Sequence, residues 1–522
     1  MKYLIILSIS VIFLFSIVAC NFLINIPEYN SMITFEGLPS DNLLWLLSAT
    51  ETVTFKVKVK DVSPVATFCA TVDSHPVTIA SSDITRDASN ATITVHLTPS
   101  LPSMKFEFSI FDGGKEVASK EVELKFGKIL LPKELESTSL SEAFGYYALE
   151  EDQTYPVNSP LEIPSGKILY IRSGVVMRFN ENVGITVEGA LKTSETISST
   201  AKLTSYSTSS FKWDGITVKK DGFVDISNVH IEKAKVGIKV EDQSEGGELR
   251  VSRTTFRGNN KGICISSTSG MDSTATPIVI TGSTFEHNDI AGIEVERGYV
   301  DVENCEFNGN AVTSQTTPLP TNPSDIASAT GGIVLWQVTD STVNNNTFTS
   351  NNVGIFAYYS HFSVDYNELN SNYRAGIYLY DSNPEMEENN IKNATSTTFA
   401  ASSVYTSRPI CLFIAGKANT TSIEKNSFSA GSIGIYIATN TSSEATQLHL
   451  NHNDIYDNRY NFYNDAKIRI DATYNYWGIT DESTSSTNTA NTAIDATLYP
   501  NPTDTSAPGH IYYVPWSASP YL

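Results

Sequence analysis

The sequence is poor in basic residues and in cysteine. Its 522 residues include 35 lysines and arginines against 57 aspartates and glutamates, a formal net charge of −22. A surface of that sign repels the phosphates of nucleic acids and of anionic lipids, so neither is expected as a partner. A neutral ligand or a cation fits better. At this length, with 40% apolar residues, more than one folded unit is expected.

The cysteines form no C-x-x-C pair and no regular spacing, which argues against a metal site or a framework of disulfides. Four of them are expected to be isolated, buried thiols: Cys69, Cys264, Cys305 and Cys411. The signatures of phosphate-binding loops, serine hydrolases and zinc proteases are also missing. The eight histidines are scattered, and those beside expected turns, His287, His361 and His452 among them, are interpreted as solvated turn residues.

The first twenty residues carry the pattern of a secretory signal. Lys2 precedes an apolar run from Tyr3 to Val18. The segment ends in Ile17-Val18-Ala19-Cys20, which resembles the bacterial lipobox. That resemblance implies a diacylated Cys20 and a lipoprotein held at the cell surface or in the periplasm. An ordinary cleaved signal or an uncleaved anchor helix is the alternative, and all three put the rest of the chain outside the cytoplasm.

Residues 21–130 alternate apolar and polar side chains in short runs such as "TVTFKVKVKD" and "ATITVHLT". This alternation predicts an antiparallel β-sandwich. The segment resembles the immunoglobulin-like spacer domains of bacterial surface proteins, which implies a spacer or presentation role. Residues 131–160 change in character and are expected to form a linker and N-terminal cap with one short helix.

An internal repeat governs the rest of the chain. A Gly-Ile pair recurs, most often after 22 residues, and the longer intervals contain inserts at 312–331 and 393–408 that are expected to be loops. Pro409-Ile410 is expected to replace one pair. The pairs begin at Gly215, Gly237, Gly262, Gly292, Gly332, Gly354, Gly376 and Gly434. Asparagines recur before and after a second apolar anchor in each repeat, as at Asn367 and Asn372, and are expected to stack as structural turn residues.

Coils of about 22 residues with tight turns and inward aliphatic side chains predict a parallel β-solenoid. Three segments, "LEIPSGKILYIRSGVVMRFNENVGITVEGAL", "WDGITV" and "NYWG", make the sequence similar to the right-handed parallel β-helix proteins of the pectate-lyase-like superfamily. The resemblance implies an all-β chain with a right-handed parallel β-helix over 161–478. A C-terminal cap over 479–522, around Trp477 and Trp516, is expected to follow.

Members of that superfamily include polysaccharide lyases and hydrolases, but their signature segments are missing here. The aspartate pairs of the hydrolases do not occur, and neither do the Asp-His step and Arg-x-Pro-x-x-Arg segment of the lyases. Arg408-Pro409 lacks its partners. A non-catalytic role is therefore favoured and no cofactor is expected. Calcium on the acidic turn of Asp381, Glu385, Glu387 and Glu388 is the alternative to a solvated turn.

Strand parity places a second set of side chains opposite each inward isoleucine. These outward residues are polar in the first coils and aromatic in the later ones. The aromatic ladder comprises Trp336, Phe356, Tyr358, Tyr378, Tyr380, Phe413 and Tyr436. An exposed row of rings suits sugar faces, whereas the inserts or the sandwich can instead cover it as a second core.

Two functions follow from these patterns. The first is a non-catalytic surface lipoprotein whose β-helix binds polysaccharide or an envelope partner through the aromatic ladder. The second is a lyase or glycoside hydrolase for an acidic polysaccharide. Its candidate residues lie where polar and aromatic coils meet, at Glu294, Glu296, Arg374 and Tyr378.

Overall fold

The computed structural model divides into two compact units, one formed by Met1–Leu130 with Glu142–Ala148 and the other by Leu131–Ser141 with Leu149–Leu522. The residues that it describes are 32–39, 41–47, 51–99, 103–136, 140, 144–193, 198–206, 211–270, 276–312, 329–393, 409–418, 423–438, 441–443, 448–466, 468–478, 494, 498–499, 511–513, 517 and 519–521. Within these residues, no helix has the length and apolar character needed to cross a membrane.

The first unit is a β-sandwich, as the alternating sequence predicts. One sheet has the order β1 (Ile33–Glu36), β3 (Val53–Val59), β7 (Asn90–Leu97) and β6 (Ile84–Asp87). The other joins β2 (Leu43–Leu46), β9 (Lys115–Leu130), β8 (Ser103–Asp112), β4 (Thr67–Val72) and β5 (His75–Val77). All pairs are antiparallel except β2 with β9. Phe55 and Phe106, with ring centroids 5.0 Å apart, lie in its core.

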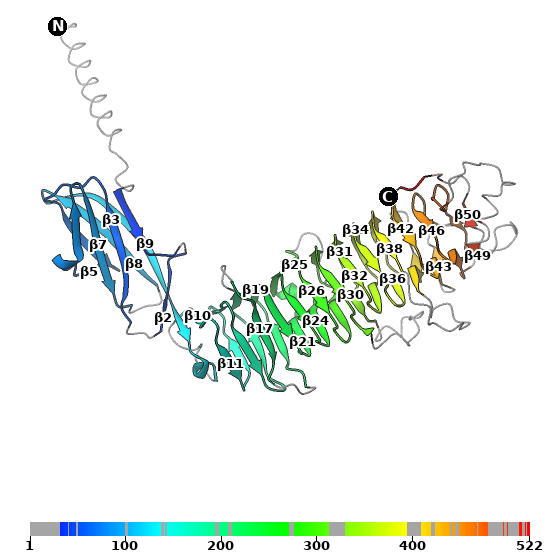
Figure 1. Ribbon diagram of the computed structural model, residues 1–522, viewed down its shortest axis with the longest axis horizontal. Helices are drawn as coiled ribbons and strands as arrows, with labels where there is room; N and C mark the ends of the chain where they lie inside the picture. The colour runs from blue at the N-terminus through cyan, green and yellow to red at the C-terminus, as the bar shows by residue number, and fades with distance from the viewer. Residues whose placement is uncertain are drawn as a thin grey trace, which may run out of the picture. The chain divides into compact units, whose positions relative to one another are not determined.

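The second unit is a solenoid of three parallel sheets whose strands follow one another along its length in chain order (Figure 1). The 3-10 helix η3 (Pro132–Glu136) and β10 (Tyr146–Leu149) precede it in the chain. One sheet contains β13 (Ile168–Ile171), β16 (Ala190–Thr193), β19 (Phe223–Ser227), β22 (Glu248–Ser252), β25 (Ile278–Thr281), β28 (Val300–Glu303), β31 (Thr339–Asn344), β34 (His361–Asp365), β37 (Glu385–Glu387) and β41 (Ile423–Glu424).

The second sheet contains β11 (Thr154–Val157), β14 (Val176–Phe179), β17 (Ala201–Ser205), β20 (Val229–Glu232), β23 (Thr255–Arg257), β26 (Thr284–Glu286), β29 (Glu306–Asn308), β32 (Thr347–Thr349), β35 (Glu368–Asn370), β38 (Asn390–Lys392), β42 (Ser427–Ser429) and β46 (Asp454–Tyr456). The third contains β12 (Leu161–Ile163), β15 (Gly184–Val187), β18 (Gly215–Val218), β21 (Val236–Val240), β24 (Lys261–Ser266), β27 (Ala291–Glu296), β30 (Gly331–Trp336), β33 (Val353–Tyr358), β36 (Ala375–Tyr380), β39 (Ile410–Ala415), β43 (Ile433–Ile437), β47 (Tyr460–Asn464) and β49 (Leu498–Tyr499).

Short strands complete the C-terminal coils: β40 (Lys417–Ala418) pairs with β44 (Ser442–Ser443), and β45 (Leu448–His449), β48 (Ile470–Asp471) and β50 (Ile511–Tyr512) form a small sheet. The parallel sheets thus begin at β11, a few residues before Leu161, and include strands beyond Gly478. Trp477 is buried. Trp516 lies outside the described residues, as does Cys20.

Glycine and phenylalanine recur because neighbouring coils approach each other closely. A Cβ on Gly262 would lie 2.5 Å from the carbonyl oxygen of Gly292 and 2.8 Å from the ring of Phe285, so only glycine fits. Phe285 stacks on Phe256 and Phe307, with ring centroids 4.9 Å apart in both pairs. The inward isoleucines of the Gly-Ile pairs are buried throughout, as parity predicts.

The predicted stacks of asparagines are present and buried. In one of them, Asn351 Nδ2 donates to Asn372 Oδ1 at 3.1 Å, and its own Oδ1 accepts from Asn310 Nδ2 at 2.8 Å. Each asparagine also accepts the backbone N–H of its counterpart one coil earlier, as Asn351 does from Asn310 at 3.0 Å. The side chains therefore satisfy turn groups that no strand reaches.

Two details differ from the sequence analysis. Gly376-Ile377 aligns with Cys411-Leu412 and not with Pro409-Ile410, because Ile377 pairs with Leu412. The four cysteines after residue 32 are free, as expected, but Cys69 is exposed while the other three are buried. Its position on an outer strand face of the sandwich explains the difference, since the neighbouring Ala70 faces the core.

Candidate functional site

The aromatic ladder is a second hydrophobic core. Phe356, Tyr358, Tyr378, Tyr380, Phe413 and Tyr436 are each 0–6% exposed, and Trp336 is partly buried against them. The rings stack from coil to coil, with 4.3 Å between the centroids of Phe356 and Tyr378 and 4.7 Å between Tyr378 and Phe413. Burial contradicts an exposed ladder and matches the alternative of a second core. The inserts are expected to cover the ladder, but most of their residues, 313–328 and 394–408, lie outside the described residues.

The four catalytic candidates do not meet in an open groove. Glu294 is aligned with Val334, then Phe356, then Tyr378, so three strand spacings, about 14 Å, separate its backbone from that of Tyr378. Tyr378 is fully buried. The glutamates are in ion pairs with other groups, Glu294 with Lys261 at 2.5 Å and Glu296 with Arg297 at 2.6 Å.

Arg374 is 1% exposed, and burial lowers the pKa of its guanidinium to about 10. A group removed from solvent in this way does not line an accessible substrate site.

The acidic turn predicted as a calcium alternative is engaged with its own neighbours. Asp381 accepts the backbone N–H of Lys417, and Glu387 forms an ion pair with Lys425. Across the described residues, no group of three or more histidine, cysteine, aspartate or glutamate side chains is arranged to hold a metal ion.

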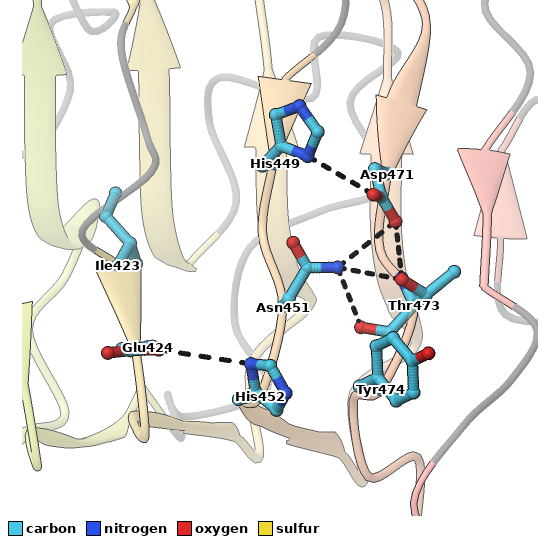
Figure 2. A pocket seen from close by; sticks show the side chains of 8 residues that line it. All are labelled: Ile423, Glu424, His449, Asn451, His452, Asp471, Thr473 and Tyr474. Atoms are coloured by element: carbon cyan, nitrogen blue, oxygen red, sulfur yellow. Dashed lines mark hydrogen bonds and ion pairs between the residues drawn. The ribbon is translucent and has the colours of Figure 1, made fainter.

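An open groove lies instead near the C-terminal end of the solenoid, with a volume of about 350 Å³. Ile423, Glu424, His449, Asn451, His452, Asp471, Thr473 and Tyr474 line it. The side chains come from β41, β45, β48 and the turns that follow them, so three successive coils contribute. Figure 2 shows the side chains of His449 and Asn451 directed at Asp471 and Thr473 on the neighbouring coil, with which they interact.

Asp471 is the electrostatic centre of the groove. Its Oδ1 accepts from Asn451 Nδ2 at 3.1 Å and from the Thr473 hydroxyl at 2.6 Å, while His449 Nδ1 lies 3.2 Å from Oδ2. Burial alone raises the pKa of Asp471, but these hydrogen bonds outweigh it and the net pKa is lowered. The carboxylate therefore stays ionised at neutral pH and fixes the side chains around it.

The rings of His452 and Tyr474 line part of the groove. His452 stacks on Tyr474 with 5.5 Å between ring centroids, and Tyr521 meets His452 edge-on at 5.7 Å. The Tyr521 hydroxyl donates to the Tyr474 carbonyl at 2.6 Å, which ties the end of the chain to this turn. Tyr474 is 49% exposed. Glu424 lies beside the rings, with a carboxylate oxygen 3.9 Å from His452 Nδ1.

Comparison with known proteins bears on the fold. A family model described as a right handed beta helix region matches residues 244–408. No curated protein and no solved structure matches the chain. Together with the three parallel sheets, the match establishes a right-handed parallel β-helix preceded by a sandwich.

Sequence reasoning missed this groove for an identifiable reason. From the sequence, His452 is interpreted as an isolated, solvated turn residue, and in the coil after Gly434-Ile435 the pair that marks the repeat is replaced by Asn461-Phe462. The asparagine positions contained the missing signal. Asn453 and Asn475 are 22 residues apart, and Asn453 N–H donates to Asn475 Oδ1 at 2.8 Å, so the preceding residues, His452 and Tyr474, belong to equivalent turns.

Proposed function

We propose that this protein is an exported lipoprotein, anchored through a lipid on Cys20, whose β-helix binds polysaccharide without cleaving it. The binding surface is the groove around Tyr474 and not the aromatic ladder, whose rings are buried. The observation that carries the proposal is one half-exposed aromatic ring beside several fixed hydrogen-bonding side chains in an open groove.

The chemistry of the groove fits sugars well. The face of the Tyr474 ring that is not stacked on His452 packs against the C–H face of a pyranose, while Glu424, Asn451 and His449 offer acceptors and donors to its hydroxyls. Because Asp471 holds Asn451 in place, little side-chain entropy remains to be lost on binding. The absent signature residues of the superfamily enzymes support a binding role over a catalytic one.

The substitution Tyr474→Ala is expected to weaken polysaccharide binding about tenfold or more, because truncating an aromatic contact residue removes over about 1.4 kcal/mol. Isothermal titration of the mature protein against a panel of oligosaccharides measures this loss. Tyr206→Ala is the matched control, since Tyr206 is 52% exposed and is not among the residues that line the groove. Equal loss in both variants, or none in Tyr474→Ala, contradicts the proposal.

The same samples test the enzyme alternative. Unsaturated or new reducing ends accumulating over hours in an acidic polysaccharide would show that the protein is a lyase or hydrolase.

The anchor is tested separately. Cys20→Ser is expected to move the exported protein from the membrane fraction to the soluble fraction, because a lipid on this cysteine supplies the attachment. Retention of the variant in the membrane fraction would mean that another segment anchors it.

A further inference from the structure

One residue per coil occupies the left-handed backbone region at the same turn. The residue after it is an asparagine from Asn346 onward and is Val229, Thr254, Ser283 or Cys305 in the earlier coils. We name this row the turn column. Its members have φ between 46° and 60°. They are Asn228, Arg253, Gly282, Asn304, Asn345, Tyr366, Glu388, Lys425, His452 and Tyr474. From Asn228 to Lys425, the backbone N–H of each member donates to a carbonyl of the next coil, as Tyr366 does to the Glu387 carbonyl at 3.1 Å.

The identities change along the turn column. Glycine and asparagine adopt this conformation at little cost, and they occupy four of the first five positions. The last five positions contain neither. Tyr366 and Tyr474 take φ values of 58° and 60° while their side chains remain 54% and 49% exposed. No burial compensates for the strain of these bulky residues, and strain of this kind clusters at functional sites.

The two exposed tyrosines of the turn column lie in line along the solenoid, four coils apart. Tyr366, Glu388, Lys425, His452 and Tyr474 occupy consecutive coils, as the pairing of Asp365 with Glu387 and of Glu387 with Glu424 shows. Four coil spacings of about 4.8 Å separate the outer two, which is about 19 Å. That distance exceeds one sugar ring and suits several linked rings lying along the solenoid.

The surface between the tyrosines is acidic. Lys425 forms an ion pair with Glu387. Glu424 precedes Lys425 in the sequence and Glu388 follows Glu387, so three glutamates surround one lysine. Negative charge of the three glutamates raises the pKa of Lys425, with the Glu387 hydrogen bond as the largest contribution. Arg469 is exposed two residues before Asp471 but is not among the residues that line the groove. A uronate or sulfate on a sugar would be repelled here, and an ammonium group would be attracted.

We propose that the ligand is a linear polysaccharide that carries free amino groups and lies along the turn column from Tyr474 to Tyr366. This inference rests on the proposed function and extends its site. The exposed parts of the Tyr474 and Tyr366 rings contact two separate sugars of one chain. Glu424 and Glu388 receive the ammonium groups of sugars between them.

The test uses glucosamine oligomers of increasing length, their N-acetylated counterparts and oligogalacturonate, titrated against the mature protein. Oligomers long enough to span about 19 Å are expected to bind about tenfold tighter than the disaccharide. Tyr366→Ala is expected to remove that gain, so that long oligomers bind the variant no more tightly than the disaccharide does. Glu424→Gln keeps the shape of the side chain and reduces the preference for free amines over N-acetyl groups. Tyr206→Ala changes neither quantity.

Tyr366→Asn is the control that distinguishes a loss of binding from a folding defect. Asparagine suits the left-handed turn, so this variant is expected to keep or raise the Tm while losing the length-dependent gain. Long oligomers that bind no tighter than short ones overturn the extended site. Equal binding of amino and N-acetylated oligomers overturns the charge assignment while the proposed function stands. Absence of binding by every oligomer, including neutral ones, overturns the proposed function itself.

Discussion

Replacing Tyr378 by alanine is expected to lower the free energy of unfolding by about 3–5 kcal/mol, the range for truncating a large aromatic residue in a packed core. Tyr378 is fully buried and stacks on Phe356 and Phe413 in the coils on either side. Its removal leaves a cavity that two coils cannot close, because their backbones are held by parallel sheet pairing. Urea unfolding of the purified protein measures the loss.

The control is Tyr206→Ala, which removes a half-exposed tyrosine and is expected to change the free energy of unfolding by no more than about 0.5 kcal/mol. Tyr378→Phe keeps the ring and guards against a variant that fails to fold. If Tyr378→Ala costs as little as the control, the aromatic ladder is not a core and its rings return as a candidate binding surface.

Replacing Asn351 by alanine is expected to lower the free energy of unfolding by about 3 kcal/mol, because it leaves buried polar groups on two neighbouring coils without hydrogen-bond partners. The Asn351 side chain accepts from the backbone and side chain of Asn310 and donates to the Phe307 carbonyl at 2.9 Å and to Asn372. No water is expected to replace it at a fully buried position. Thermal unfolding followed by circular dichroism detects the loss as a fall in Tm.

Asn308→Ala is the matched control for this substitution. Asn308 lies two residues before Asn310 in the same coil, at the end of β29, but its side chain is exposed. A small effect there beside a large one at Asn351 assigns the stability to the buried stack and not to asparagine in general. Equal effects at the two positions would contradict that assignment.

The solenoid was predictable from sequence because its coils repeat the same physical constraints. Gly262 is glycine because Phe285 and the next backbone leave no room for a Cβ, and Asn351 is asparagine because turn groups need a partner. Each constraint recurs at a fixed interval and becomes visible as a pattern. The alignment failed at Pro409-Ile410, where the preceding insert obscured the interval and the true counterpart, Cys411-Leu412, lacks glycine.

The site was less predictable because parity gives the direction of a side chain and not what covers it. Parity placed Phe356 and Tyr378 opposite the inner core correctly, yet both an open face and a second core satisfy that geometry. The groove was not predicted because Glu424, His452 and Tyr474 are brought together by coils of different length, 27 and 22 residues, at the end of the repeat. Tyr366 and Tyr474 are half exposed and have a left-handed φ, and none of the buried ladder tyrosines has either property.

On this account, the buried rings form a core and the exposed rings bind the ligand. Chemical labelling of tyrosines with and without a long glucosamine oligomer, read by mass spectrometry, tests it most directly. Tyr474 and Tyr366 are expected to be labelled in the free protein, where both are about half exposed, and protected by the oligomer. Tyr378, fully buried, is expected to stay unlabelled in both samples. Labelling of Tyr378 that the oligomer suppresses, with Tyr474 and Tyr366 unaffected, would contradict the account.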